Sequence, residues 1–275
     1  MWDTKISEVL LLKMLTDTHS HIYLPEFDSD REAMIENAFE NNIHRLFLPN
    51  VDSTSIEAML SASKKYPGKL FPMIGLHPCS VKENFEEELK IVEDYLKEKK
   101  QWVAIGEIGI DLYWDKTFVK QQEFVFLKQL DLAVESDLPV VIHSRNSFNE
   151  IYDLLVERRN KKPFTSKHLR GIFHCFSGTI EQATKIIEFG NFKLGIGGVV
   201  TFKHSGLDIV VGQIDLKHLV LETDSPYLAP VPYRGKRNNP SYLIEVAKKI
   251  AEIKNVPVDE VAEITTENSK EVFGI

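Results

Sequence analysis

The chain has 275 residues, of which 43% are hydrophobic and 27% are charged, and its formal net charge is −8. This composition is ordinary for a soluble globular protein, and the acidic balance argues against broad nucleic-acid binding while leaving a local site open. No apolar run approaches the ~18 residues of a membrane span, and the run Val9–Leu12 is too short for a secretory signal. Because the two cysteines, Cys79 and Cys175, form no paired motif, we expect a cytoplasmic protein without membrane contact.

Short apolar runs alternate with amphipathic helical stretches along the chain, which is the pattern of a parallel α/β sheet. The runs predicted as strands are Leu15–Ile22, Arg45–Pro49, Leu70–Leu76, Trp102–Glu107, Val140–His143, Gly171–His174, Phe192–Ile196 and Leu219–Glu222. The predicted helices include Asp30–Asn41, Glu86–Lys99, Val119–Ser136, Ile180–Phe189, Ser241–Lys254 and Val258–Phe273. A (β/α)8 barrel is typically ~250 residues long, so we expect an α/β fold that consists of a single (β/α)8 TIM barrel.

Six potential metal ligands each stand at the end of one of these apolar runs. They are His19, His21, Glu107, His143, His174 and Asp224. The ends of parallel strands share one rim of a barrel, so these side chains are expected to meet there. Four imidazoles and two carboxylates are enough for two divalent ions, and two metals on such a rim favour hydrolysis, above all of a phosphate ester. Asp17, two residues before the first histidine, is a candidate for orienting a ligand.

Each of these residues also has a purely structural explanation when it is taken alone. His19 and His21 lie two apart, so on a strand they face the same side, but such a pair can equally be two hydrogen-bonded histidines in a turn. Glu107 could form an ion pair at the barrel mouth, and Asp224 could cap the turn that follows it. A lone histidine at a strand end is more often only hydrogen-bonded. Together, these explanations require six coincidences on one rim, so the metal site is the better hypothesis.

A second group of residues is expected to contact substrate. His77 ends the third predicted strand and is a candidate for substrate contact or for acid catalysis, although a structural histidine is equally consistent. The loop of residues 225–240 follows the last strand, so it should lie on the same rim, and it holds the densest basic cluster near the site. Guanidinium groups grip phosphate oxygens, whereas a short basic run is often only solvated. The expected substrate contacts are His77, Arg145, Arg234, Lys236 and Arg237.

Seven segments, taken in order, resemble the TatD family of metal-dependent deoxyribonucleases. They are Leu15-Thr-Asp-Thr-His-Ser-His, Gly75-Leu-His-Pro, Gly106-Glu-Ile-Gly-Ile-Asp, Pro139-Val-Val-Ile-His-Ser-Arg, His174-Cys-Phe-Ser-Gly, Leu221-Glu-Thr-Asp-Ser-Pro and Arg234-Gly-Lys-Arg-Asn. The resemblance implies a (β/α)8 barrel, a divalent-metal site made of the six residues named above, and hydrolysis of DNA phosphodiester bonds, commonly as an exonuclease. It covers residues 14–275, so residues 1–13 are expected to form an N-terminal extension. The family usually places an apolar residue and then Asp or Asn after the His-x-His pair, whereas here Tyr23 follows Ile22, which we expect to change the groove beside the ligands.

Our hypothesis for the reaction places two divalent ions (Mg²⁺, Mn²⁺ or Zn²⁺) on the rim, where they activate a hydroxide. The ligands would be His19, His21 and Asp224 for one ion and His143 and His174 for the other, with Glu107 bridging both. Asp224 would orient the hydroxide or accept its proton, so Asp224 and Glu107 are the expected catalytic residues. The expected partner is DNA, single-stranded or frayed at its ends, with no obligate protein partner.

The main rival hypothesis is an amidohydrolase-type deacylase that acts on a small molecule or on aminoacyl-tRNA. Many such enzymes bridge their metals with a modified lysine on the fourth strand. This chain has Glu107 there, and the difference weakens the rival.

Overall fold

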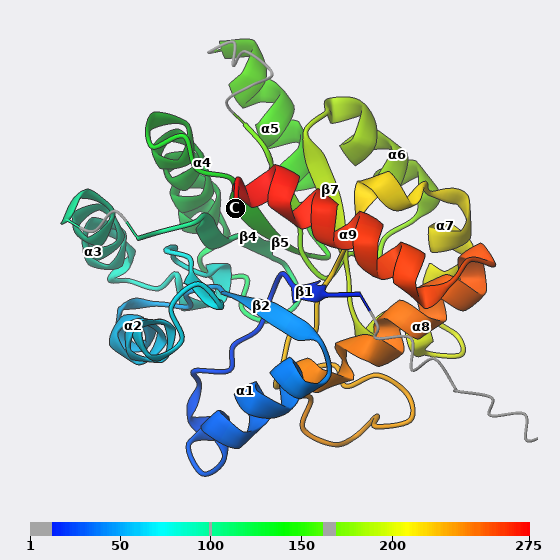
Figure 1. Ribbon diagram of the computed structural model, residues 1–275. Helices are drawn as coiled ribbons and strands as arrows, with labels where there is room; N and C mark the ends of the chain where they lie inside the picture. Colours follow the sequence, from blue (N-terminus) through cyan, green and yellow to red (C-terminus); the bar gives the residue numbers. More distant parts are fainter. Residues whose placement is uncertain (1–12, 99–100, 162–168) are drawn as a thin grey trace, which may run out of the picture.

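The computed structural model describes residues 13–98, 101–161 and 169–275. In these ranges eight strands alternate with helices, and a ninth α-helix ends the chain (Figure 1). The strands are β1 (Leu15–Asp17), β2 (Ile43–Leu48), β3 (Leu70–Pro72), β4 (Ile105–Asp111), β5 (Val140–Arg145), β6 (Gly171–Phe173), β7 (Phe192–Ile196) and β8 (Leu219–Leu221). The α-helices are α1 (Arg31–Glu40), α2 (Ile56–Lys65), α3 (Phe85–Glu98), α4 (Val119–Glu135), α5 (Phe148–Lys161), α6 (Ile180–Phe189), α7 (Leu207–Gln213), α8 (Leu243–Lys254) and α9 (Val258–Phe273). The predicted alternation of strands and helices is confirmed.

All strand pairs are parallel, and they form two sheets in chain order, β1-β2-β3 and β4-β5-β6-β7-β8. Isolated parallel bridges join the edges of the two sheets. Between β3 and β4, the backbone N–H of Ile74 donates to the carbonyl of Ala104 at 3.1 Å. Just after β1 and β8, Ser20 pairs with Ser225, and the N–H of Asp224 donates to the carbonyl of His19 at 2.8 Å. The strands therefore follow one another around the middle of the molecule, with helices outside them (Figure 1).

An apolar cluster lies on the inner side of the strands. Its buried members are Phe47, Met73, Ala104, Val141, Ile172, Val220, Val272 and Phe273. Side chains two residues apart on a strand face the same side, so the residues two positions after Val141 and Ile172, namely His143 and His174, form the next layer. Because of this two-residue alternation, the layer that contains His143 and His174 lies directly above the apolar cluster.

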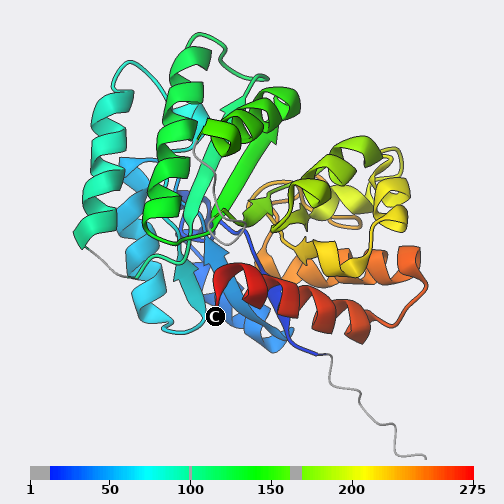
Figure 2. The ribbon, with the colours of Figure 1, turned by 90° about the horizontal axis from the view of Figure 1, so that it is seen from above.

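Helix α9 covers the opposite ends of the strands, as Figure 2 shows. The ring of Phe273 stacks on Phe47 with ring centroids 3.8 Å apart, and the Thr266 hydroxyl donates to the carbonyl of Met14, just before β1. Helix α9 thus packs against the ends of the strands opposite to the polar layer. Residues 1–12 lie outside the described residues, so the expected N-terminal extension stays a prediction.

Predicted boundaries of three strands were wrong by several residues: β3 ends at Pro72 instead of Leu76, and β1 and β4 differ as follows. β1 ends at Asp17, because the backbone from Thr18 onward bonds to Leu221 and then to Ser225 as separate contacts instead of one ladder. β4 begins later than expected and runs on to Asp111, with a register shift between Gly106 and Ile108 that places Glu107 at an irregularity inside the strand. Such bulges re-aim one side chain. Among the described residues, no helix is long and apolar enough to cross a membrane.

Candidate metal centre

Four of the six predicted ligands bring donor atoms close together next to His19 and His21, just after β1. The Nε2 atom of His19 lies 3.2 Å from Nε2 of His21 and 3.1 Å from Oε2 of Glu107. The Oδ1 atom of Asp224 lies 3.8 Å from Nε2 of His19 and 3.6 Å from Nε2 of His21. The Nε2 atoms of His19 and His21 thus each lie within 4 Å of both carboxylates, and nitrogen and oxygen donors gathered in this way are the kind that bind divalent metals.

The other oxygen of Glu107 faces a second group of histidines. Its Oε1 atom lies 2.8 Å from Nδ1 of His143, 3.3 Å from Nε2 of His77 and 3.7 Å from Nε2 of His174. His174 also stacks on His19, with ring centroids 3.4 Å apart. Glu107 is almost fully buried. Its two oxygens face two different sets of donor atoms, so the carboxylate lies between them.

Neighbouring side chains fix which nitrogen two of the histidines present. Tyr23 is buried, and its hydroxyl donates to the carbonyl of Pro49 at 2.5 Å, so its oxygen is left to accept from Nδ1–H of His21 at 3.2 Å. Nε2 of His21 then faces the cluster. On β5, Nε2–H of His143 donates to Oδ2 of Asp111 at 3.0 Å, which turns Nδ1 towards Glu107. Partners of this kind orient metal-binding histidines.

Asp17 holds the backbone of the site. Its Oδ1 accepts from the backbone N–H of His19 and of Thr223, and its Oδ2 accepts from the Thr223 hydroxyl at 2.6 Å. These bonds tie the segment after β1 to the segment after β8. Asp224, next in the chain, adopts a φ of 56°, which is uncommon for a residue with a side chain. Asp17 therefore orients the ligands through the main chain, not through an imidazole.

The pKa values of the buried groups are shifted in different directions from their usual values. Burial, together with the nearby His174, lowers the pKa of His19 to about 4, so this imidazole is neutral and keeps a lone pair. Burial would raise the pKa of Glu107, but the surrounding histidines, His77 above all, hold it well below its usual range. Burial would lower the pKa of His174, but the adjacent carboxylates, that of Glu222 first, raise it to about 10. A proton on His174 thus offsets acidic charge that a divalent cation would neutralise instead.

The donor set fits a divalent metal. Three buried carboxylates and one partly exposed carboxylate, that of Asp224, lie among the histidines, and within the described residues none of the four has a Lys or Arg ion-pair partner. The buried three are Glu107, Asp111 and Glu222. The buried atoms Nδ1 of His19 and Oε2 of Glu222 have no hydrogen-bond partner among the described residues. Uncompensated charge and unpaired polar atoms at this depth are unfavourable unless a cation supplies the missing interactions.

Comparison with known proteins agrees with this geometry. The family model described as TatD related DNase matches residues 16–274. The chain belongs to the TatD family. Its TatD relatives include a Bacillus subtilis protein named uncharacterized metal-dependent hydrolase YabD, which is 38% identical over 263 residues, covering 95% of this chain and 100% of YabD.

Solved structures of TatD proteins share the fold. The crystal structure of YjjV, a TatD homologue from Escherichia coli, superposes with a TM-score of 0.86 at 28% identity and covers 95% of this chain and 98% of YjjV. A TatD family hydrolase from Entamoeba histolytica gives a TM-score of 0.78 at 21% identity, with coverage of 95% and 98%, which shows the common fold alone.

In this TatD protein, the residues that were expected to contact substrate lie in different surroundings. His77 lies within the cluster, beside Glu107. Arg145 is exposed, and its guanidinium lies 3.9 Å from the centroid of the Tyr113 ring. Arg237 instead binds within the fold, where it donates to Asp30 at 2.5 Å and to the carbonyl of Glu26 at 2.5 Å.

The remaining two basic residues lie on the same loop. Arg234 stacks over Phe202 at 4.4 Å. Lys236 is exposed and has no ion pair among the described residues. Of the loop cluster, Lys236 is therefore the most available to an incoming anion.

Sequence reasoning missed the supporting roles of three residues, Tyr23, Asp111 and Glu222. Tyr23 was expected to change the groove beside the ligands, but its side chain is buried behind His21. Asp111 and Glu222 each directly follow apolar residues on a strand. A carboxylate in that position is rarely buried without a partner, and this signal could have identified both.

Proposed function

We propose that this protein is a divalent-metal-dependent hydrolase that cleaves DNA phosphodiester bonds. We also propose that its two sheets form a single (β/α)8 barrel over residues 14–275, with the metal centre at the C-terminal rim of the strands. Membership of a family described as TatD related DNases supports the reaction. The observation on which the proposal depends most is the division of the Glu107 oxygens between two donor groups.

Two ions would be held by the residues already described. His19, His21 and Asp224 would hold one, His143 and His174 the other, and Glu107 would belong to both. When bound, such ions offset charge on a phosphate and make a water molecule acidic enough to attack at neutral pH. Nitrogen-rich ligation favours Zn²⁺ or Mn²⁺ over Mg²⁺.

Asp224 is the proposed proton acceptor. Burial would raise the pKa of its carboxyl, but His174 first, and then His21, lower it below the usual range, so the group is ionised at neutral pH. The side chain of Asp224 is 13% exposed, whereas that of Glu107 is 3% exposed. Solvent water therefore reaches the carboxylate of Asp224 more easily than that of Glu107. An ionised carboxylate at this position can orient an attacking water and accept its proton.

The proposed substrate is DNA that is single-stranded or frayed at its ends. Two exposed cations would contact backbone phosphates: Arg145, two residues after His143, and Lys236, on the loop that follows Asp224. The net charge of −8 disfavours binding elsewhere on the surface. His77, beside Glu107, would contact the phosphate or protonate the leaving oxygen.

A direct assay tests the function. The purified protein is stripped with a chelator, checked for metal content, and incubated with Mg²⁺, Mn²⁺ or Zn²⁺ and end-labelled single-stranded or double-stranded DNA. We expect no cleavage after stripping, recovery with Mn²⁺, and mononucleotide products released from single-stranded ends. Full turnover in verified metal-free protein would refute the metal mechanism. Failure to cleave any DNA, combined with hydrolysis of N-acyl substrates, would favour the deacylase instead.

A further inference from the structure

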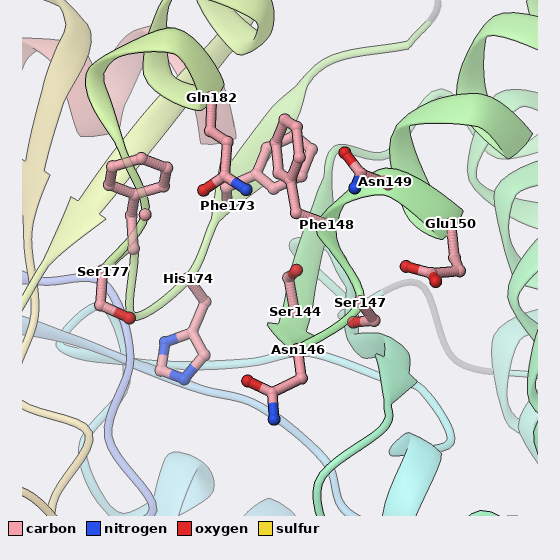
Figure 3. A pocket seen from close by; sticks show the side chains of 12 residues that line it. Ser144, Asn146, Ser147, Phe148, Asn149, Glu150, Phe173, His174, Ser177 and Gln182 are labelled. Atoms are coloured by element: carbon pink, nitrogen blue, oxygen red, sulfur yellow. The ribbon is translucent and has the colours of Figure 1, made fainter.

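A cavity of about 360 Å³ lies between the loops that follow β5 and β6. Its polar lining includes Ser144, Asn146, Asn149, Ser177 and Gln182. Figure 3 shows Ser144 on β5, the other side chains on the loops after β5 and β6 and the helices that follow them, and His174 at the edge of the same space. Because His174 also lies 3.8 Å from Oδ1 of Asp224, the cavity opens directly beside the candidate metal centre.

The polar groups of this cavity are available to a ligand. In the part of the chain that the structure describes, the side chains of Ser144, Asn146, Asn149 and Ser177 make no hydrogen bond. Gln182 accepts from the backbone N–H of Thr179 through Oε1, which leaves its NH₂ group free. By contrast, Ser147, in the same loop, is buried and donates its hydroxyl to the carbonyl of Ile110. The cavity therefore combines uncommitted hydroxyls with amide groups that both donate and accept.

The charge of the lining selects against a phosphate group. Among the described residues that line the cavity there is no Lys or Arg, and the one ionisable side chain among them besides His174 is the acid Glu150. A phosphate placed there would face a carboxylate without any cation to offset it. The half-buried ring of Phe148 supplies an apolar surface instead. These groups suit an uncharged, flat group with hydrogen-bonding edges, and the volume lies in the range of small-ligand sites.

We propose that this cavity binds the nucleobase of the nucleotide whose phosphate is cleaved, an inference that rests on the proposed function. Amide side chains such as those of Asn146 and Asn149 pair with the donor and acceptor edges of bases. Aromatic rings such as that of Phe148 provide a face for base contact. With the base in the cavity, the phosphate of the same nucleotide is directed past His174 towards Glu107 and Asp224. The cavity thereby orients the terminal nucleotide for cleavage.

The test compares two classes of substrate with the same leaving group. The nucleotide substrates are the p-nitrophenyl esters of thymidine 3′-phosphate and 5′-phosphate, and the reference is methyl p-nitrophenyl phosphate, which has no base. The main variant combines Asn146→Gly with Asn149→Ala. Asn146 has a φ of 57°, so glycine removes its amide and tolerates the left-handed backbone. Asn160→Ala is the matched control, because Asn160 is an exposed asparagine on the same helix, α5, distant in sequence from the cavity.

We expect the ratio of kcat/KM for the nucleotide ester over the methyl ester to fall about tenfold in the double variant, the effect of losing neutral hydrogen bonds to substrate. Asn160→Ala should keep the wild-type ratio. Ser177→Trp, which fills the cavity from an exposed position, should lower the ratio as well. Metal content and Tm are measured for each variant, because damage to His174 would lower turnover of both esters and leave the ratio unchanged.

The outcomes separate the two proposals. If the wild-type protein cleaves nucleotide esters and neither the double variant nor Ser177→Trp changes the ratio, the cavity does not bind the base and this inference is wrong. If the wild-type protein cleaves no phosphodiester with any metal, the proposed function fails, and the inference fails with it.

Discussion

The carboxylate of Glu107 and the imidazole of His143 are 2.8 Å apart, while the far side of the same imidazole lies 3.0 Å from Asp111. His143 is therefore held between two carboxylates, one within the cluster and one behind it. Asp111 also accepts the backbone N–H groups of Tyr113 and Trp114 at 2.8 and 2.9 Å. One buried acid thus orients a candidate ligand and shapes the adjoining loop.

Replacing Asp111 by Asn should weaken metal binding without unfolding the protein. The amide oxygen of Asn can still accept from the loop N–H groups, but the side chain no longer provides a charged acceptor for His143. Loss of such an orienting partner typically lowers metal affinity ~10–100-fold. Metal titration of the stripped variant measures the effect, and an unchanged affinity would show that Asp111 serves the loop alone.

Replacing Tyr23 by Phe should affect both stability and the metal site. The hydroxyl bonds to the carbonyl of Pro49 and to His21, so its loss leaves a buried carbonyl unpaired and destabilises the fold by ~1–3 kcal/mol. Without its partner, His21 is less firmly oriented, and metal affinity should fall as well. Thermal unfolding and metal titration measure the two effects, with Tyr152→Phe as the control on α5. Unfolding at the wild-type temperature with unchanged affinity would contradict this role.

Neutralising Arg145 and Lys236 together should raise KM for DNA more than it lowers kcat, because phosphate contacts position the backbone. The dependence of binding on salt should also become shallower, by ~1 in slope for each phosphate that is no longer bound. Lys64→Ala is the control, since Lys64 lies at the end of α2, which leads into the start of β3, away from the site. Unchanged KM and salt dependence would place the nucleic acid elsewhere.

Arg237 should behave differently from these two exposed cations. Its guanidinium joins the loop to two residues that precede α1: the carboxylate of Asp30 and the backbone carbonyl of Glu26. Arg237→Ala is therefore expected to loosen the loop, and for that reason it is a poor test of substrate binding.

A protein that begins at Met14 should keep its metals and its turnover. Lys13 bonds to Asp259 through its backbone N–H at 3.0 Å and pairs with Glu263, but this pair is exposed and should add no more than ~1 kcal/mol. Both acids lie on α9, at the end of the molecule opposite the candidate site. Metal analysis and thermal unfolding of the shortened protein provide the check. A shortened protein that folds but loses metal would place the extension at the site.

The sequence predicted the positions of the candidate ligands better than it predicted the residues that orient them. The strand period places His143 and His174 two residues after buried apolar positions, so their common layer followed from the pattern alone. The bulge at Glu107 does not follow from the pattern, because Ile108, Gly109 and Ile110 continue an apolar run in either register. The contact between Tyr23 and His21 depends on the bend after β1, which the expected continuous strand concealed.

The central claim is that Glu107 belongs to two metal sites at once, and metal analysis of the wild-type protein and three variants tests it most directly. Wild-type protein, Glu107→Ala and His21→Ala are loaded with Mn²⁺ or Zn²⁺, freed of excess ion, and assayed for bound metal per chain, with Glu40→Gln on the exposed surface of α1 as the control. The account predicts two ions in the wild-type and control proteins, loss of one in His21→Ala, and loss of both in Glu107→Ala with turnover lower by orders of magnitude. Retention of one full ion in Glu107→Ala, with the other lost, would contradict the shared carboxylate.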